Sequence, residues 1–422
     1  MRTPRAQLGI GFWLFLLLMA VYLLSYSGGY HSVDELSVTA MTATLVKEGR
    51  VSTDQIRWSQ GWTPSQGRIG PDGHLYSKKG LGSALLAAPF YWLGIHIPQS
   101  GAIRFVMLAN AFVTALTAWL LYRCVLELDY RPTVAVLTAL AYGLGTMAWP
   151  YAKYLFSEPL TTLGLVLALL GLLALRRSRR QRTGGARFAF LAGVGLGLAL
   201  LAKVANGVAW PFFVAYGFWI IFHRPEEGPR SGVGKGRRDP APTSVPGAYR
   251  LAGAFLAPLV LTGLVLAAYN LARTGQLFDL GYAADETFST PLWLGLSGFL
   301  FSPGKSLFLF SPILLAALFG IPALLRQDRA TALLSLAVVV AYPLLYAGWF
   351  MWWGGWSWGP RFLVPILPFF TAADLFIPAE PPGTLTIETV PRGDFGAART
   401  VNIRRLPSTE ARISVYLRDF EQ

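Results

Sequence analysis

The chain is dominated by apolar segments long enough to cross a lipid bilayer. Blocks of roughly 17–22 mostly apolar residues recur along it, and a helix of about twenty residues spans the hydrocarbon core of a membrane. Of its 422 residues, 54% are hydrophobic and only 14% are charged. A soluble enzyme of this size needs far more polar surface to cover its core. The sequence therefore predicts an all-α polytopic membrane protein.

Ten of these segments are predicted to span the membrane. The segment 81–97 is short, contains Pro89 and is rich in interfacial aromatic residues. If it does not span, the loops on one side hold sixteen lysines and arginines, and the other side, after residue 97 and before the tail, holds six. This asymmetry agrees with the positive-inside rule, so we expect an interfacial or re-entrant helix at 81–97 and a cytoplasmic N-terminus. The predicted spans are 8–26, 102–122, 133–149, 159–175, 188–205, 207–222, 251–270, 306–325, 331–348 and 361–378.

The net charge of +14 follows mainly from this topology. The basic run at 176–182 comes directly after a span and lacks the interleaved aromatic residues of a single-strand binder. We therefore expect the lipid bilayer as a partner, and no nucleic acid. The single cysteine, Cys124, excludes an intramolecular disulfide and a cysteine-based metal cluster, and the four histidines lack metal-ligand spacing.

Composition divides the chain into a transmembrane domain, 1–378, and a C-terminal tail, 379–422. Within the domain, 28–100 is interpreted as a long extracytoplasmic loop that carries the interfacial helix. The polar segment 223–250 is interpreted as a flexible cytoplasmic loop. An even number of spans places the tail in the cytoplasm. Its alternating polar and apolar residues predict short strands at 384–390, 400–404 and 413–417.

The few charged residues of the extracytoplasmic face gather near the ends of the spans. Asp34 and Glu35 form an adjacent acidic pair about eight residues after the first span. Tyr76 and Lys78 follow a Pro-Asp-Gly turn signal, just before 81–97. The other candidates are Glu158, Lys305 and Arg361.

Each of these residues also has a simpler explanation. A loop carboxylate such as Asp34 is usually solvated, and Glu158, which precedes a proline at a helix start, suits a helix cap. Lysines and arginines at span ends often serve as interfacial anchors. This explanation applies to Lys305 and Arg361, and more strongly to Lys203.

Five tryptophans lie between residues 349 and 358. They fit an aromatic belt at the membrane interface, and they fit equally well a platform for a sugar ring or a lid over a lipid headgroup. On the second interpretation Trp352, Trp353 and Trp356, together with Tyr76, contact the sugar or the lipid.

Acids and cations at the mouth of a helical bundle suit the transfer of a group from a membrane-bound phosphate donor. A carboxylate deprotonates an acceptor hydroxyl. Lysine and arginine hold the phosphate and stabilise its charge as it leaves. An apolar groove between helices accommodates the lipid chain.

Six short motifs follow one another along residues 8–378. They are Val-Asp-Glu at 33–35, Asp-Gly-His-Leu-Tyr-Ser-Lys at 72–78, Phe-Ser-Glu-Pro-Leu at 156–160, Tyr-Asn at 269–270, Phe-Ser-Pro-Gly-Lys at 301–305 and Trp-Trp-Gly-Gly-Trp-Ser-Trp-Gly-Pro-Arg at 352–361. In this order and spacing they resemble the integral-membrane GT-C glycosyltransferases. The resemblance is strongest to glycosyltransferase family 39 and to bacterial proteins like the protein O-mannosyltransferases.

The resemblance implies a GT-C-like helical bundle in a bacterial-type inner membrane, with its active site on the extracytoplasmic face. The implied donor is a polyprenyl-phosphate-linked sugar, and the acceptor is a hydroxyl on a glycan, lipid or protein. Transfer would typically invert the anomeric carbon. The resemblance makes Asp34 the general base and matches Glu158 to a further acid of the second outer loop. Some GT-C enzymes also use a divalent cation, Mg or Mn, which this sequence does not identify.

On this basis we expect Glu35 to assist Asp34, and the donor phosphate to be bound by Lys78, Lys305 and Arg361. Two other interpretations stay open: a transporter or flippase for a lipid-linked sugar, and a catalytically inactive GT-C-like subunit of a membrane complex. A transporter needs charged sites near the bilayer midplane. The ionisable residues gather instead at span ends, which favours the enzyme.

Overall fold

The protein consists of a helical bundle and a small C-terminal unit. The chain divides by its contacts into Met1–Phe376 and Ile377–Gln422, and each unit is described by itself. The computed structural model describes residues 4–61, 66–99, 101–181, 183–223, 245–374, 385–389, 399–405 and 409–414.

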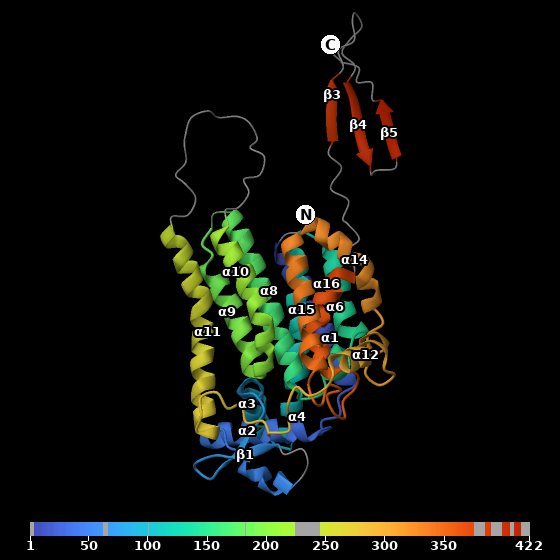
Figure 1. The fold of residues 1–422 in the computed structure, drawn as a ribbon. Helices are drawn as coiled ribbons and strands as arrows, with labels where there is room; N and C mark the ends of the chain where they lie inside the picture. The colour runs from blue at the N-terminus through green and yellow to red at the C-terminus, as the bar shows by residue number, and fades with distance from the viewer. Residues whose placement is uncertain are drawn as a thin grey trace, which may run out of the picture. The chain divides into compact units, whose positions relative to one another are not determined.

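Among the described residues, six helical segments of the bundle have the length and apolar composition to cross a membrane (Figure 1). Three come from the first half of the chain: α1 (Pro4–Leu24), α4 (Ala102–Met107) joined to α5 (Ala109–Glu127), and α8 (Ser157–Arg180). The other three are η2 (Val204–Ala209) joined to α10 (Trp210–Phe222), α11 (Val245–Thr274) and α15 (Arg329–Ala347).

Shorter apolar helices complete the bundle. They are α3 (Leu81–His96), α6 (Pro132–Gly145), α9 (Ala186–Ala202), α12 (Leu292–Phe301), α14 (Leu314–Gln327), and η3 (Arg361–Ile366) continued by α16 (Leu367–Asp374). Two helices of a single turn, α7 (Ala148–Tyr151) and α13 (Leu307–Phe310), lie in connections.

The prediction of an all-α membrane bundle is confirmed, but the number of ten spans is not. Helix occurs in every predicted span, and four of these segments are shorter than a bilayer-spanning helix. The predicted span 306–325 is interrupted between α13 and α14, where Pro312 has no N–H to donate. Sequence reasoning missed α12 because its ten residues are too few to be recognised as a span.

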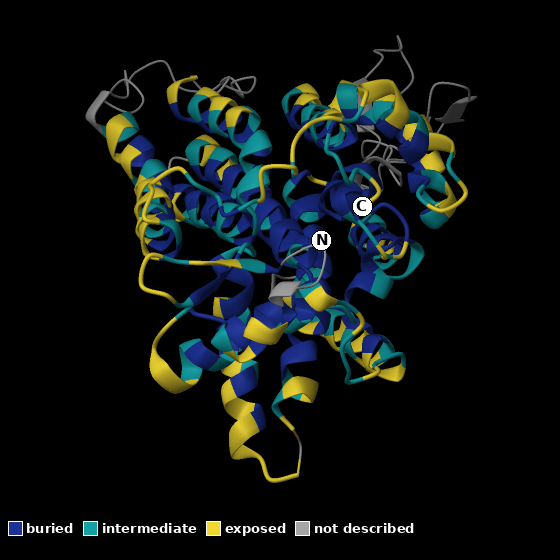
Figure 2. Ribbon diagram, turned by 60° about the horizontal axis from the view of Figure 1, so that its bottom comes forward, coloured by how far each residue is buried: buried dark blue, intermediate teal, exposed yellow. Residues whose placement is uncertain are grey.

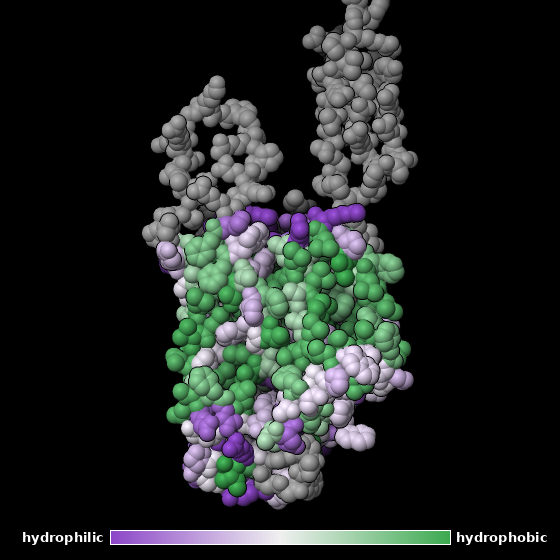
Figure 3. Space-filling view, in the orientation of Figure 1, coloured by the Kyte–Doolittle hydropathy of each residue, from purple (hydrophilic) through white to green (hydrophobic). Residues whose placement is uncertain are grey.

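The outer surface of the bundle is apolar around its middle. Figure 3 shows a hydrophobic belt between hydrophilic rims at the two ends of the bundle. On α11, Val260, Leu261 and Leu264 are 61–63% exposed, although residues of this type are usually buried in soluble proteins. Buried residues concentrate where the helices meet (Figure 2). This distribution is expected of helices whose outer faces contact lipid.

Helices α8 and α9 pack along a seam of small residues. A Cβ atom on Gly164 would lie 2.5 Å from the carbonyl oxygen of Gly195, and one on Gly171 would lie 2.7 Å from the backbone nitrogen of Ala192. No larger residue fits at these positions without a shift of the backbone. Such close approach is characteristic of helix pairs in membranes. The seam also fixes the end of α9, which Lys203 follows directly.

One end of the bundle is covered by a folded segment within the predicted loop 28–100. Its first element, α2 (Val33–Glu48), begins with a capping box formed by Ser32 and Glu35. The helix ends at Gly49, whose φ of 68° is the left-handed conformation that glycine adopts without strain. This helix was not predicted from the sequence, because the composition of 28–80 is polar.

A short hairpin and α3 complete this cover. After η1 (Asp54–Gly61), strand β1 (Gly67–Ile69) pairs antiparallel with β2 (Leu75–Ser77), with Gly67 opposite Ser77. Helix α3 follows, close to the predicted bounds 81–97, and packs against α2 and α4. Figure 1 shows α2, α3, α4 and β1 together at this end.

The described residues of the C-terminal unit form three antiparallel strands in the order β3-β4-β5, in the segment where alternation predicts strands. They are β3 (Leu385–Thr389), β4 (Arg399–Arg405) and β5 (Thr409–Ser414). Most of the predicted flexible loop 223–250 lies outside the described residues, and α11 begins within it at Val245.

Candidate active site

A cavity of about 650 Å³ lies beneath α2 and the segment that leads into α3. Its wall also includes the start of α8, the connection from α9 to η2, the end of α11, parts of the segment 278–288, the end of α15, and η3. Aromatic and aliphatic side chains form much of the wall. The charged residues that line it are Asp34, Lys78, Lys79, Glu158, Lys203, Arg273, Asp279, Glu286 and Arg361.

Asp34 lies between two cations. Its Oδ1 is 2.6 Å from Nζ of Lys79, and its Oδ2 accepts a hydrogen bond of 2.9 Å from the guanidinium of Arg361. The three groups come from the first turn of α2, the segment before α3 and the start of η3. Residues more than 300 positions apart are thereby joined in one cluster.

The two cations dominate the titration of Asp34. Burial raises the pKa of the carboxyl, but the charges and hydrogen bonds of Lys79 and Arg361 outweigh it and hold the pKa well below its ordinary value. Burial also lowers the pKa of Lys79, against the opposing effect of Asp34. In this state Asp34 is an ionised carboxylate at any physiological pH.

Arg361 is held by aromatic rings as well as by Asp34. Its guanidinium lies 4.8 Å from the ring centroid of Phe156 and 5.0 Å from that of Phe362. Gly354 has a φ of 74°, and a Cβ there would lie 2.8 Å from Cγ of Arg361. Glycine therefore allows the preceding loop to pass close to this side chain.

Glu158 and Lys203 form a second charged pair in the wall. Lys203 Nζ is 3.9 Å from Oε1 of Glu158 and lies over the rings of Phe362 and Tyr346, at 4.0 and 4.7 Å from their centroids. Burial, only partly offset by the charge of Glu158, lowers the pKa of Lys203 to about 7. Lys203 lies in the connection between α9 and η2 and contributes its charge to the cavity.

Lys78 is paired within the cavity wall. Its Nζ lies 2.5 Å from Oε1 of Glu286, and both side chains are at most 10% exposed. A second ion pair, Arg68 to Asp279 at 2.7 Å, joins the same segment to β1. These two pairs hold the segment after α11 over the cavity.

Glu35 and Tyr76 do not line the cavity. Glu35 is fully buried, and its carboxylate accepts hydrogen bonds from the backbone N–H groups of His31, Ser32 and Leu155. Burial raises its pKa. The hydroxyl of Tyr76 donates to Asp72 in the hairpin turn. Both residues therefore organise the cover of the bundle.

Lys305 does not line the cavity either. Its Nζ donates to the carbonyl oxygens of Gly355, Ser357 and Gly359 at 2.7–3.1 Å. An ammonium with three acceptors in one loop fixes the shape of that loop. Lys305 thus supports Arg361, which follows the loop directly.

The predicted tryptophan contacts lie elsewhere as well. Trp352 packs edge-on against Phe299 of α12, and Trp356 is fully exposed. Trp353 is 38% exposed, and none of the three is among the residues that line the cavity. Trp349 is the tryptophan in its wall.

The structure therefore brings together four of the predicted residues, Asp34, Lys78, Glu158 and Arg361. It adds Lys203, which the sequence analysis interprets as an interfacial anchor. It also adds four residues that were not predicted: Lys79, Arg273, Asp279 and Glu286. The sequence feature that could have identified Lys79 is its position next to Lys78. The guanidinium of Arg273 lies 4.7 Å from the ring centroid of Tyr269, whose Tyr-Asn motif was recognised.

A divalent cation does not fit this arrangement. Among the described residues, no group of three or more histidine, cysteine, aspartate or glutamate side chains is placed to hold a metal ion. Each of the four carboxylates that line the cavity already lies beside a basic side chain: Asp34, Glu158, Asp279 and Glu286.

Known proteins resemble this chain in part of its sequence and in its fold. Residues 88–232, about a third of the chain, match the family model described as dolichyl-phosphate-mannose-protein mannosyltransferase. Residues 360–421 match a model described as a C-terminal domain. No curated protein matches the sequence.

Two solved structures share the fold. The apo oligosaccharyltransferase of Archaeoglobus fulgidus has 12% identity and a TM-score of 0.55, with 87% of this chain and 50% of that chain covered. ArnT from Cupriavidus metallidurans bound to undecaprenyl phosphate has 13% identity and a TM-score of 0.53, with 88% of this chain and 60% of that chain covered. This chain thus spans between half and three fifths of their lengths.

The fold is that of the integral-membrane GT-C glycosyltransferases. Together with the matched segment 88–232, it confirms the resemblance that the six sequence motifs indicate, to mannosyltransferase-like GT-C proteins.

Proposed function

We propose that the protein transfers a sugar from a polyprenyl-phosphate donor to an acceptor hydroxyl, and that the cavity around Asp34 is its active site. The observation that carries the proposal is the contact of one carboxylate with two cations, Lys79 and Arg361, in a partly apolar cavity. A base, a phosphate site and room for a lipid chain are the three parts that such a transfer needs.

The cations of the Asp34 cluster suit the donor phosphate. A phosphate that binds Arg361 and Lys79 competes with Asp34 for their charge and their hydrogen bonds. The pKa of Asp34 then rises from its lowered value, and the carboxylate becomes a stronger base. Donor binding in this way activates the base only when the leaving group is in place.

The reaction is a direct displacement. The acceptor oxygen forms a bond to the anomeric carbon while the bond from that carbon to the phosphate oxygen breaks, and the electron pair leaves with the phosphate. The acceptor proton goes to Asp34. Arg361 and Lys79 stabilise the charge on the departing phosphate. One displacement inverts the anomeric carbon.

The remaining wall residues have supporting parts in this proposal. Glu158 and Lys203 orient the sugar or the acceptor. Lys78 becomes a third phosphate ligand when it exchanges Glu286 for the donor. Leu266, Phe278 and Phe288 offer apolar surface to the prenyl chain. By the distribution of loop charges, the cavity faces the extracytoplasmic side of a bacterial-type inner membrane, with the N-terminus in the cytoplasm.

Proteoliposomes that contain the full chain test this proposal. Undecaprenyl phosphate, the product expected from a bacterial-type donor, should raise the melting temperature, and a radiolabelled polyprenyl-phosphate sugar should be cleaved when a membrane extract supplies acceptor. Movement of the intact donor across the bilayer without cleavage would instead identify a transporter. Binding without cleavage under all acceptor conditions would identify an inactive subunit.

The proposal predicts a pH dependence of the activity that arises from Lys203. Its pKa is lowered to about 7, so the side chain is cationic below that pH and neutral above it. If the cation is the active form, kcat/KM for the donor falls as the pH rises through about 7. Lys203→Arg, which stays charged, should move this fall to higher pH, whereas Lys153→Arg, outside the cavity, should not. A wild-type profile that stays flat between about pH 6 and 8.5 would contradict the role of Lys203.

A further inference from the structure

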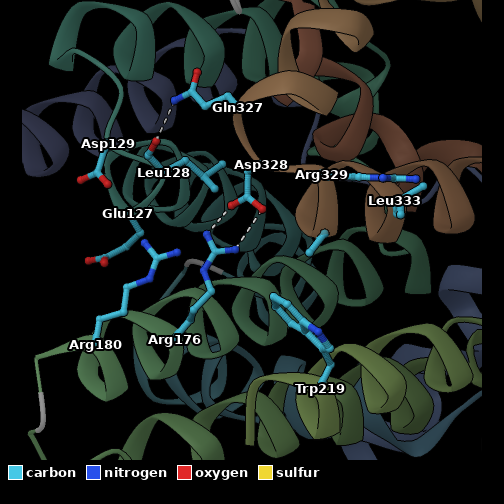
Figure 4. A pocket seen from close by; sticks show the side chains of 11 residues that line it. Glu127, Leu128, Asp129, Arg176, Arg180, Trp219, Gln327, Asp328, Arg329 and Leu333 are labelled. Atoms are coloured by element: carbon cyan, nitrogen blue, oxygen red, sulfur yellow. Dashed lines mark hydrogen bonds and ion pairs between the residues drawn. The ribbon is translucent and has the colours of Figure 1, made fainter. Parts of the chain in front are cut away.

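A second cavity, of about 490 Å³, lies at the arginine-rich end of the bundle (Figure 4). The ends of α5, α8, α10 and α14 and the start of α15 surround it. Helix α8 begins at the first cavity with Glu158 and reaches the second with Arg176 and Arg180. Its 24 residues make it about 36 Å long, so the two cavities lie at opposite ends of this helix.

Arg176 and Asp328 form the rigid part of this second cavity. The guanidinium of Arg176 contacts both carboxylate oxygens of Asp328, one of them at 2.9 Å, and also donates to the hydroxyl of Tyr216 at 3.0 Å. Asp328 in turn accepts from the backbone N–H of Thr331 and caps α15. This network links α8, α10 and α15, and its charges neutralise each other.

Two other arginines of the cavity are not paired in this way. Arg180 and Arg329 line it and are exposed, and within the described part of the chain neither has an ion pair or a hydrogen bond from its side chain. The carboxylate of Glu127 forms an ion pair with the guanidinium of Arg177, at 3.3 Å. Asp129 is the acid of this cavity that has no ion pair or side-chain hydrogen bond among the described residues. Two unpaired arginines against one unpaired acid leave a net positive charge.

The cavity also has an apolar wall. Trp219 on α10 and Leu333 on α15 line it and are 41% and 51% exposed. Both residues belong to helices that are long and apolar enough to span the membrane. Figure 4 shows the indole of Trp219 on the side of the cavity opposite Gln327. Cationic and apolar surfaces thus meet where the spans leave the bilayer.

We propose that this second cavity binds the headgroup of an anionic phospholipid, of the phosphatidylglycerol type. Arg180 and Arg329 hold the phosphodiester, and Asp129 accepts a hydrogen bond from the glycerol hydroxyl. The first part of an acyl chain lies along Trp219 and Leu333. Basic pockets between helices on the cytoplasmic side are suited to anionic headgroups, and the positive-inside rule places this end there. The bound lipid joins α8 to α15.

The test compares lipid retention by the full chain in nanodiscs that contain phosphatidylcholine alone or mixed with phosphatidylglycerol. Native mass spectrometry should find phosphatidylglycerol retained selectively, and Arg180→Ala with Arg329→Ala should lower its retention by roughly tenfold or more. The matched control removes two exposed arginines at the starts of α9 and α11, Arg187→Ala with Arg250→Ala, and should retain the lipid.

Three outcomes overturn the proposal. Equal losses in the two double variants would show that only the general charge of this end matters. Equal retention of phosphatidylcholine would show that the phosphodiester charge is not recognised. Displacement of the lipid by millimolar inorganic phosphate, or stabilisation by phosphate alone, would identify a site for a free phosphate compound. None of these readouts depends on glycosyl transfer, so a failure here leaves the proposed function intact.

Discussion

Asp34→Asn is expected to reduce cleavage of the polyprenyl-phosphate donor by about 10²- to 10⁴-fold, the usual contribution of a general base. Asparagine keeps the size of the side chain and can still accept one hydrogen bond from Arg361 or Lys79. It cannot take the acceptor proton. The measurement is the initial rate of polyprenyl phosphate release in proteoliposomes, with the melting temperature of the same preparation as a check of folding.

Glu35→Gln is the matched control, because it removes the adjacent carboxylate on the same helix. The carboxylate of Glu35 accepts hydrogen bonds from three backbone N–H groups and does not line the cavity. We expect the variant to melt at a lower temperature, because a neutral amide is a weaker acceptor for these groups. The folded fraction should retain most of the activity. Near-wild-type activity in Asp34→Asn would refute its role as the base.

Arg361→Ala is expected to lower kcat/KM for the donor by about 10²- to 10³-fold, as the loss of one group that stabilises developing charge commonly does. Without Arg361, the carboxylate of Asp34 keeps only Lys79 as a partner, and the departing phosphate loses a planar donor. Arg361→Lys should recover part of the loss, because the charge returns without the two-pronged geometry of the guanidinium.

Steady-state kinetics with varied donor concentration provide the measurement for Arg361. Arg104→Ala, an exposed arginine at the same end of the bundle and outside the cavity, is the control and should behave like the wild type. If Arg361→Ala changed the melting temperature but neither kcat nor KM, Arg361 would be a structural residue only.

The bundle was largely predictable because the apolar pattern reports which segments contact lipid. The length of each helix was less predictable, since a short helix such as α9 (Ala186–Ala202) is continued by η2 and the pattern does not register the break at Lys203. The pattern also does not indicate α2, because this helix is buried against the other elements of the cover and not against lipid.

The site was predictable to the extent that charge is rare in such a chain. Asp34, Glu158 and Arg361 attract notice because few acids and bases occur on this face, and all three line the cavity. The direction in which each side chain points was not predictable. Adjacent residues on a helix point about 100° apart, and the sequence does not indicate which of Asp34 and Glu35 faces the cavity.

The directions and partners of the lysine side chains were not predictable either. Lys78 and Lys79 are neighbours, yet one pairs with Glu286 and the other with Asp34. Lys305 looked like a phosphate ligand because nothing in the sequence indicates that three carbonyl oxygens of the loop before Arg361 surround it.

The glycine seam between α8 and α9 has a consequence for natural variation in this chain. Lys203 reaches the cavity from the end of a helix that is positioned by direct contact of two backbones at Gly164 and Gly195. A methyl group at either position must displace α9, and a stiff, densely packed helix carries that displacement to its end. Substitutions far from the cavity can therefore change its shape, which depends in part on residues that have no side chain.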